Sequence, residues 1–443
     1  MKRWAIRAAL LAGLGVSIAA VAIGARASYI LAGYKAKMLC SEVLIAGRDQ
    51  AAVLTDLDVD DLWPLRFLSA SLSSATGTTA ASLPFGLSRR EARFQQGVGC
   101  VLQHGERATI AASAVADRPD SPLDSAAIDP GLSEVVNAAF LEPDPTRLRR
   151  TRAIVIVRNG QIVAERYAAG FGPRSPFPGW SMTKSALNAL VGILVSQGKL
   201  ALEQPAPVPE WRDDPRQRIT IDHLLRMSSG LDFDERISLP RFDVMSMLFE
   251  APDMASFATH ARLRAEPGAR WQYASGSSLI ISGIMKRILG GEDYRGFPKQ
   301  ALFDRLGMSG AVIEPDASGT FVASSYMYAT AREWGRLGAL YAQDGMYEGV
   351  EILPSWWVAY SRTPAPADPA RSYGAHFWLT LPDTYNASHT TLPADAFHMA
   401  GHEGQFVTIA PSRQAVIVRL GKTRHPGAWD QSRFAADVLA AMR

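Results

Sequence analysis

A serine and a lysine, three positions apart, begin an apolar segment with helical spacing. Ser181 and Lys184 lie in PGWSMTKSALNALVGILVSQGKL, which covers residues 178–200. Residues three apart on a helix share a face, so the two side chains are expected to be neighbours. A serine hydroxyl is a poor nucleophile near neutral pH unless a base lies beside it. The alternative is that Ser181 only caps the helix, which leaves unexplained a lysine where the helix dipole disfavours a cation.

Tyr273 is the candidate for a second group that handles the proton. An unperturbed lysine has a pKa near ~10.4, so it is protonated near neutral pH and needs strong desolvation or a partner. Tyr273-Ala274-Ser275 stands before a second apolar helical segment. A tyrosine beside a lysine cation can approach the phenolate, accept the serine proton and return it to a leaving group. The alternative is a packed aromatic ring whose hydroxyl is hydrogen-bonded to a neighbour.

A third cluster, His402-Glu403-Gly404, is predicted to open a strand that continues from Gln405. Glycine at a strand edge permits close approach of a ligand, so Gly404 is a candidate substrate contact. The backbone amide of Gln405 could point at a carbonyl oxygen, as an oxyanion hole requires. His402 is expected either to hold the substrate or to tune Tyr273, although a lone histidine is more often hydrogen-bonded locally.

The elements that must position these residues are strands at both ends of a long helical stretch. RAIVIVR and QIVAERYA flank Asn159-Gly160, a strong hairpin signal, and QFVTIAP and QAVIVRLG flank Ser412-Arg413. The sequence between the two hairpins is mostly helical, and the chain ends in an amphipathic segment. This pattern predicts an α+β fold, with one antiparallel sheet built from both ends and an all-helical lobe inserted between them.

The N-terminal third has a different character. Basic residues precede an uncharged run over residues 8–25, so residues 1–27 are predicted to be either a signal peptide or an inner-membrane anchor. Residues 28–112 have short mixed segments without long helical periodicity and are expected to form a small accessory module. Residues 113–126 are rich in Pro, Asp and Ser and are the predicted linker, and residues 127–443 form the main domain.

The two cysteines, Cys40 and Cys100, both lie beyond the apolar run. In a chain exported to the cell envelope (periplasm) they can form a disulfide, and the alternative is two buried thiols. The spacings of a zinc or redox site are missing, so no metal site is predicted. The net charge of +3 comes from 46 basic and 43 acidic side chains spread along the chain, and nothing in it indicates a nucleic-acid partner.

The three motifs together resemble those of the serine β-lactamase-related family, on its class C β-lactamase, esterase and D-amino-peptidase side. Within it, GWSMTKS and MYATAREW are most similar to the branch that contains 6-aminohexanoate-dimer hydrolase. Supporting blocks are ITIDHLLRMSSGLDF at 219–233, PGARWQYASGSS at 267–278 and YMYATAREWGRLG at 326–338. The resemblance covers residues 127–443 and implies an antiparallel sheet flanked by helices plus an all-helical lobe.

The resemblance also implies roles. Ser181 would form an acyl-enzyme, Lys184 and Tyr273 would shuttle its proton, and the amides of Ser181 and Gln405 would form the oxyanion hole. The chain departs from true class C β-lactamases, because Tyr-Ala-Ser replaces Tyr-x-Asn and His-Glu-Gly replaces Lys-Thr-Gly. The later pair Lys422-Thr423 is not the missing triad, since Arg424 follows it. Without that lysine, a β-lactam carboxylate is a weaker candidate for the natural ligand.

The sequence therefore predicts a serine hydrolase that cleaves a small-molecule amide or ester without a metal or organic cofactor. Two alternatives stay open: a penicillin-interactive D-amino peptidase or weak β-lactamase, and a non-catalytic module that binds cell-wall material. Besides His402 and Gly404, the weaker candidates for substrate contacts are Ser275 and Tyr326. The role of the accessory module, the natural substrate and the oligomeric state are not predicted.

Overall fold

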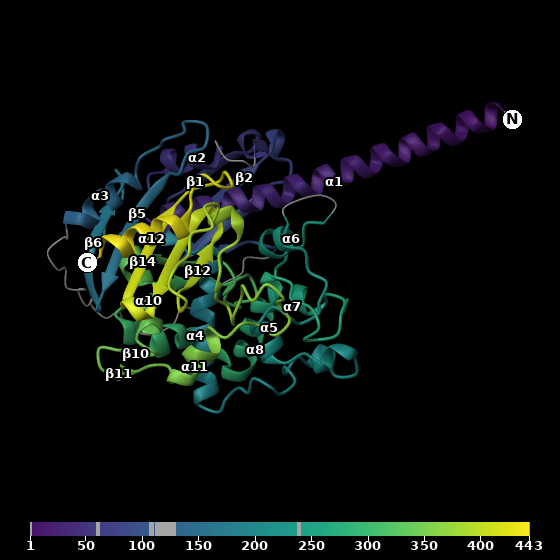
Figure 1. The fold of residues 1–443 in the computed structure, drawn as a ribbon. Helices are drawn as coiled ribbons and strands as arrows, with labels where there is room; N and C mark the ends of the chain where they lie inside the picture. Colours follow the sequence, from purple (N-terminus) through teal and green to yellow (C-terminus); the bar gives the residue numbers. More distant parts are fainter. Residues whose placement is uncertain (1, 59–62, 106–109, 111–129, 237–240, 443) are drawn as a thin grey trace.

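The computed structural model of the chain describes residues 2–58, 63–105, 110, 130–236 and 241–442. Its central element is a five-stranded antiparallel sheet in the order β12-β13-β14-β5-β6, so strands from both ends of the main domain meet where β14 pairs with β5. Figure 1 shows these strands, blue and yellow, side by side. The strands are β5 Thr151–Arg158, β6 Gln161–Tyr167, β12 Phe397–Gly401, β13 Gln405–Ala410 and β14 Ala415–Gly421.

Both predicted hairpins are present. Asn159 and Gly160 join β5 to β6 with φ angles of 51° and 78°, and two successive positive φ angles are the signature of the type I′ turn. Ser412 and Arg413 lie in the turn between β13 and β14. The strand predicted to start at His402 begins instead at Gln405, because residues 402–404 form the short turn that follows β12.

Helices cover both faces of the sheet, because its strands alternate apolar side chains between two cores. Val155 and Val157 of β5 face α10, whereas Ile154 and Ile156 face α3 and α12. The covering helices are α3 Pro130–Ala138, α10 Ala331–Ala342 and α12 Gln431–Ala441. This arrangement confirms the α+β prediction, with the sheet as the middle layer.

The predicted helical lobe lies between the two hairpins in sequence and beside the sheet in space (Figure 1). Its helices are α4 Thr183–Ser196, α5 Ile221–Leu225, α6 Asp243–Phe249, α7 Met254–Thr259, α8 Ser275–Leu289, α9 Gly291–Pro298 and α11 Ser355–Ser361. Short strands complete the domain: β7 Pro176–Pro178, β8 Val312–Ile313 and β9 Met327–Thr330 in one sheet, β10 Met346–Tyr347 and β11 Val350–Glu351 in another.

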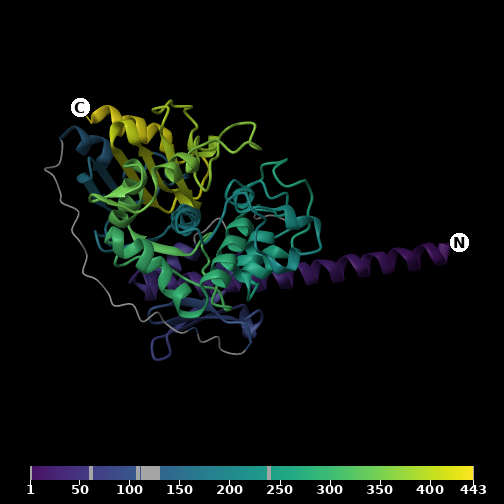
Figure 2. The same ribbon diagram turned by 90° about the horizontal axis from the view of Figure 1, so that it is seen from below.

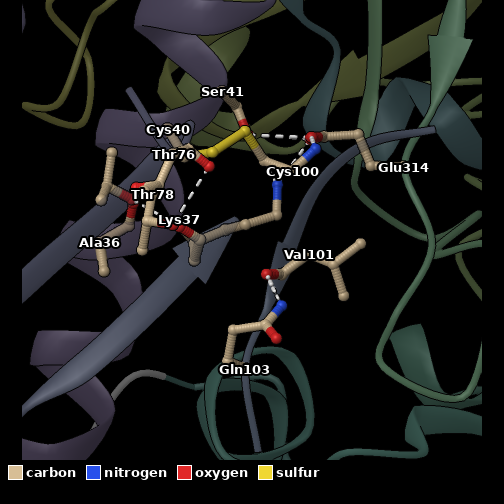
Figure 3. Close-up of a disulfide and its surroundings, with 12 residues drawn as sticks. Ala36, Lys37, Cys40, Ser41, Thr76, Thr78, Cys100, Val101, Gln103 and Glu314 are labelled. Carbon is tan, nitrogen blue, oxygen red and sulfur yellow. Dashed lines mark hydrogen bonds and ion pairs between the residues drawn. A yellow bond between two sulfur atoms is a disulfide. The ribbon is translucent and has the colours of Figure 1, made fainter. Parts of the chain in front are cut away.

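The N-terminal module consists of α1 Lys2–Leu44, α2 Gln50–Asp58 and a four-stranded antiparallel sheet against which α1 packs. The strands are β1 Ser69–Ser73, β2 Thr78–Ser82, β3 Arg90–Gln95 and β4 Gly99–Leu102. The start of α1 extends away from the body, and the helix then runs into the fold (Figures 1 and 2). A disulfide between Cys40 and Cys100 ties α1 to β4, the first of the two alternatives for the cysteines (Figure 3).

Helix α1 extends further along the chain than the sequence pattern predicted. The absence of long helical periodicity after Ser28 was misleading, because α1 continues unbroken to Leu44 and its residues from Ala32 to Glu42 are buried. A helix that is buried all round has no polar face and therefore no periodic pattern. The predicted linker, residues 113–126, lies outside the described residues. Within the residues that the structure describes, no helix has the length and apolar character needed to cross a bilayer.

Candidate active site

Ser181 lies in a tight 3-10 turn, Trp180–Met182, directly before α4. Trp180 has a φ of 47°, a left-handed conformation that costs a non-glycine residue roughly 1–3 kcal/mol and persists only when its surroundings impose it. Those surroundings are hydrogen bonds on both sides of the turn. Gly179 N donates to Met327 O at 2.8 Å, and Thr183 Oγ1 donates to Trp180 O at 2.6 Å. Strand β9 therefore fixes the turn that presents Ser181.

Trp334, the tryptophan of the AREW block, supports the same turn from behind. A Cβ atom at position 179 would come 2.2 Å from the Trp334 ring, so only glycine allows the backbone to pass here. Trp334 is fully buried in α10. The distant sequence block that begins with Tyr326 is thus a structural support of the serine.

Lys184 Nζ makes three hydrogen bonds, to Ser181 Oγ, Ser275 Oγ and Ser324 O, each at 3.0 Å. The lysine is buried, with 1% of its surface exposed. Ser181 does not cap α4, because Met182 occupies the N-cap position and the serine side chain faces the lysine instead. The capping alternative for Ser181 is therefore wrong.

The other hydrogen bonds of these three partners indicate which one is able to donate a proton to Lys184. The Ser324 carbonyl can only accept. The carboxylate of Glu235 accepts from the backbone N–H of Ser275 and from its hydroxyl, so Ser275 Oγ is left to accept from the lysine. A neutral lysine has two N–H donors for these two acceptors and one lone pair, which then faces the hydroxyl of Ser181. The hydrogen bond between Nζ and Ser181 Oγ, in which a charged lysine donates, would then be reversed, with the neutral amine as acceptor.

Burial lowers the pKa of Lys184 to about 8, against an opposing attraction from Glu235. About a tenth of the lysine is therefore neutral at pH 7, and far more above pH 8. Burial also raises the pKa of the Tyr273 phenol, Glu235 adds to that rise, and a hydrogen bond with Ser181 works against it. The direction of this pKa shift disfavours the phenolate that the sequence analysis expected at Tyr273. The two pKa shifts favour a neutral amine at Lys184 and a neutral phenol at Tyr273.

Tyr273 stands where it can meet both groups. Its ring centroid is 5.0 Å from Lys184 Nζ, and its hydroxyl hydrogen-bonds Ser181. The ring stacks on Trp378 at 5.6 Å and meets the edge of Tyr373 at 5.8 Å. These aromatic contacts hold the phenol in place while it stays half-buried at the wall of a cavity.

The turn at His402 lies against the nucleophile turn, since a Cβ at Gly401 would come 2.2 Å from Gly179 O. The backbone N–H and C=O of His398 both hydrogen-bond Trp378, on the side of β12 away from β13. Successive residues of a strand point these groups to opposite sides, so those of Gly401 point toward its partner Gln405 on β13. The amide of Gln405 thus faces Gly401, and its side chain bonds Gly421 O. The oxyanion role predicted for Gln405 is wrong. The next N–H along the chain, that of His402, points away from β13.

One cavity of about 240 Å³ joins these groups, and its walls are mainly apolar. Its lining includes Ser181, Tyr273, Ser275 and His402 from the predicted set. The other lining residues come from α1, the nucleophile turn, the loop after α5, α6, the segment before β9 and the region of β12. They are Tyr34, Trp180, Glu235, Val244, Met245, Leu248, Phe249, Ser325, Trp378, Pro382, Tyr385, Ala400 and Gly401.

Residues 138–442 match the family model described as Beta-lactamase. The chain belongs to the beta-lactamase family. This confirms the family resemblance carried by the Ser-x-x-Lys, Tyr-x-Ser and His-x-Gly motifs. The matched range includes every element of the main domain from β5 onward, and it contains Ser181, Lys184, Tyr273 and His402.

Alignments with this chain cover most of the length of several named proteins. 6-Aminohexanoate-dimer hydrolase of Paenarthrobacter ureafaciens is 26% identical over 324 residues, 66% of this chain and 79% of the relative. A family VIII carboxylesterase superposes with a TM-score of 0.55 at 15% identity, over 72% of this chain and 98% of its own. A penicillin-binding protein homologue from Caulobacter crescentus gives 0.55 at 16% identity, over 72% and 98%. The solved structures confirm the β-lactamase/transpeptidase-like fold.

Two of the weaker substrate contacts that we predicted are corrected by this beta-lactamase-family site. Gly404 does not line the cavity. It has a φ of 80°, and a Cβ there would come 2.5 Å from the guanidinium of Arg419, so glycine serves the turn and not a ligand. Tyr326 is buried and donates to Leu248 O at 2.8 Å, while its neighbour Ser325 reaches the cavity. Lys422 lies 3.5 Å from Glu403 and also does not line the cavity.

Three contributors to the site escaped the sequence analysis. Glu235 lies outside the three motifs, in the loop that follows the block at residues 219–233. Ser324 acts through its carbonyl oxygen, which leaves no mark in a sequence. Tyr34 lies in the N-terminal module, far from every motif, and only the packing of α1 brings it to the cavity.

Proposed function

We propose that this chain is a serine hydrolase that cleaves an amide or ester bond through an acyl-enzyme on Ser181. Neutral Lys184 accepts the Ser181 proton over 3.0 Å as Oγ attacks the substrate carbonyl carbon. The proton then passes by way of Tyr273 to the leaving amine or alcohol, and the carbon–nitrogen or carbon–oxygen bond breaks. Water attacks the ester of Ser181 with the same groups in reverse roles.

The oxyanion of the tetrahedral intermediate needs N–H donors that are not otherwise engaged. The amide of Ser181 at the nucleophile turn is one candidate, as the sequence indicated. The amide of His402 is the second candidate, in place of Gln405, because the hairpin register directs it away from β13 and its residue lines the cavity. The two turns that carry these amides are in contact.

The burial and the hydrogen bonds of Lys184 are the observation on which the proposal rests. A buried amine with a pKa of about 8, whose two other neighbours accept from it, leaves its lone pair to the serine hydroxyl. A module that only binds would gain nothing from this arrangement. Burial of a lysine costs free energy, and the cost is explained when the amine must act as a base.

For the substrate, the cavity favours an apolar acyl or amine portion, and the names of the relatives suggest small amides and carboxylic esters. A β-lactam carboxylate is less favoured because no lysine replaces that of the Lys-Thr-Gly triad at the cavity. Short p-nitrophenyl esters, linear 6-aminohexanoate oligomers and nitrocefin are therefore the assay series. Faster turnover of nitrocefin than of the other two would favour a penicillin-interactive enzyme instead.

The test is Ser181→Ala, with Ser196→Ala at the far end of α4 as the matched control. We expect Ser181→Ala to lose at least about a thousandfold in kcat/KM for p-nitrophenyl butyrate and to lose labelling by a fluorophosphonate. The control should keep both, and circular dichroism should be the same for all three proteins. Undiminished turnover or labelling in Ser181→Ala would reject the proposed nucleophile.

We also propose that the protein acts outside the cytoplasm, in the cell envelope. The Cys40–Cys100 disulfide supports this, because such bonds persist in oxidising compartments and are rare in the cytosol. Mass spectrometry of the protein from fractionated cells tests it. Recovery of the reduced chain in the cytosolic fraction would contradict it, and the mass would also report whether cleavage follows Ala27.

A further inference from the structure

The N-terminal module reaches the active site through one side chain, Tyr34 of α1. Its ring lies parallel to Trp180, the residue before the nucleophile, at 6.5 Å, and meets Phe249 of α6 edge-on at 5.2 Å. It lines the same cavity as Ser181 and is 4% exposed. A residue outside the range matched by the beta-lactamase family model thus forms part of the cavity wall.

We propose that α1 is a fixed wall of the substrate cavity and that Tyr34 limits the length of the apolar group that the cavity accepts. Apolar side chains of α6, namely Val244, Met245, Leu248 and Phe249, line the same cavity, and the Phe249 ring contacts that of Tyr34. An apolar chain is the substrate part that such a surface binds. This inference rests on the proposed function, since it names the specificity of the same site.

The hydroxyl of Tyr34 is also held in place. It hydrogen-bonds Arg424, which in turn donates to Glu403 Oε1 at 2.5 Å, next to His402. The phenol ring is therefore clamped between the nucleophile turn and the His402 turn. A wall residue fixed at its tip as well as on its ring faces cannot swing aside to admit a longer chain.

The helix that carries Tyr34 is locked to the main domain on both sides of it. On the N-terminal side, Arg26 pairs with Glu250 at 3.0 Å, and Arg90 of β3 donates to Phe249 O at 2.7 Å. On the C-terminal side, Lys37 pairs with the fully buried Glu314 at 2.6 Å. The module and α6 are thus held against each other beside the cavity.

Glu314 also ties the disulfide to the main domain. Its carboxylate accepts from Ser41 Oγ at 3.0 Å and from the backbone N–H of Cys100 at 2.6 Å (Figure 3). One carboxylate therefore binds α1 on both sides of Cys40 and the strand to which Cys40 is bonded. This fixes the wall more firmly than packing alone, as the size limit requires.

The experiment measures binding rather than turnover. In the Ser181→Ala background, isothermal titration gives the Kd of butanamide and of octanamide, two uncharged amides that differ by four methylenes. We expect Tyr34→Ala to raise the preference for octanamide over butanamide about tenfold, as room for two further methylenes would do. Tyr34→Phe keeps the ring and loses only its bond to Arg424, so it should shift the preference far less than Tyr34→Ala does.

The matched control is Tyr29→Ala, five residues earlier on α1, where the ring packs under Arg90 at 4.2 Å and does not line the cavity. It should leave the preference unchanged while disturbing the same helix. Tyr34→Leu is made in parallel in case truncation to alanine unfolds the module, and it should give a smaller shift in the same direction. An unchanged preference in a folded Tyr34→Ala or Tyr34→Leu protein would overturn the inference. That result is independent of the hydrolysis assay, which alone tests the proposed function.

Discussion

The chemistry of the site depends on the charge state of one residue, Lys184. Its environment contains two opposing influences: burial favours the neutral amine, and the carboxylate of Glu235 favours the ammonium. Burial in turn raises the pKa of Glu235, with Lys184 opposing the rise. Tyr273 and His376 are the other titratable groups close to the lysine, and Asp234 and Tyr373 lie close to Glu235. Glu235 therefore sets how far the lysine pKa falls.

We predict that kcat/KM rises with pH and levels off near pH 8, the pKa of Lys184. Glu235→Gln should move this limb of the profile to lower pH. Lys184 must be neutral to accept a proton, so activity falls about tenfold per pH unit below its pKa. Removing the carboxylate charge removes the attraction that holds the lysine pKa up. The glutamine oxygen can still accept from Ser275, so the activity at high pH should change only a few-fold. The measurement is the pH profile of p-nitrophenyl butyrate hydrolysis.

The matched control for this profile is Asp234→Asn, the adjacent acid, which is paired with Arg236 and does not line the cavity. The limb of its profile should lie at the same pH as in the parent protein. A limb that Glu235→Gln leaves in place or moves to higher pH would show that the carboxylate does not act on Lys184. A lower thermal stability alone, without a moved limb, would point to a purely structural role.

At the scale of residues, the sequence predicts which side chains meet in the site but not their protonation states. The spacing of Ser181 and Lys184 predicts their contact, because a helix fixes it. The choice between lysine and tyrosine as the base depends on desolvation, which is a property of the assembled cavity. Gln405 was misassigned for a related reason, since one residue of register in a hairpin reverses the direction of an N–H.

At the scale of elements, the turn that presents Ser181 is shaped by α10 as much as by its own residues. Trp334 fills the space where a side chain at 179 would lie, and β9 fixes the backbone on the other side. We predict that Gly179→Ala lowers the free energy of unfolding by about 1–3 kcal/mol through overpacking. It should also reduce the rate of fluorophosphonate labelling at Ser181, because the turn must shift.

Two further variants separate this clash from a general effect of alanine. Gly172→Ala, in a loop with open space around the glycine, should alter neither stability nor labelling. In the double variant Gly179→Ala/Trp334→Phe the smaller ring relieves the clash, so the two changes should cost less together than the sum of their separate effects. Strict additivity, measured by chemical denaturation, would contradict the proposed contact.

The hairpins and the helical lobe could be predicted because their patterns are local: Asn159-Gly160 between alternating apolar residues, and apolar stripes at helical spacing. Strand β12 could not, since its pairing partners Trp378 and Gln405 to Ile409 come from both sides along the chain. Helix α1 was missed beyond Ser28 because its inner part is surrounded, with even Lys35 and Lys37 buried. Those lysines are paired with acids that come from elsewhere in the sequence.

At the scale of the whole molecule, the module and the hydrolase domain form one packed unit, and the disulfide closes it. Cys40 and Cys100 are 60 residues apart. In the chain-entropy model, closing a loop of that size raises the free energy of the unfolded chain by about 4 kcal/mol. The bond also holds Cys40 beside Ser41 and Lys37, which bind Glu314 of the main domain. Its loss should therefore loosen both the module and the wall at Tyr34.

We predict that reduction lowers the temperature of the first calorimetric unfolding transition by several degrees and weakens the discrimination between butanamide and octanamide. The double variant Cys40→Ala/Cys100→Ala should behave like the reduced protein and show no further response to reductant, which makes it the control for other effects of the reagent. If the reduced protein kept both its transition temperature and its discrimination, the module would hold its position through packing and the Glu314 contacts alone. The disulfide would then add nothing to the wall, and residual structure in the reduced unfolded chain would account for the missing entropic effect of the bond.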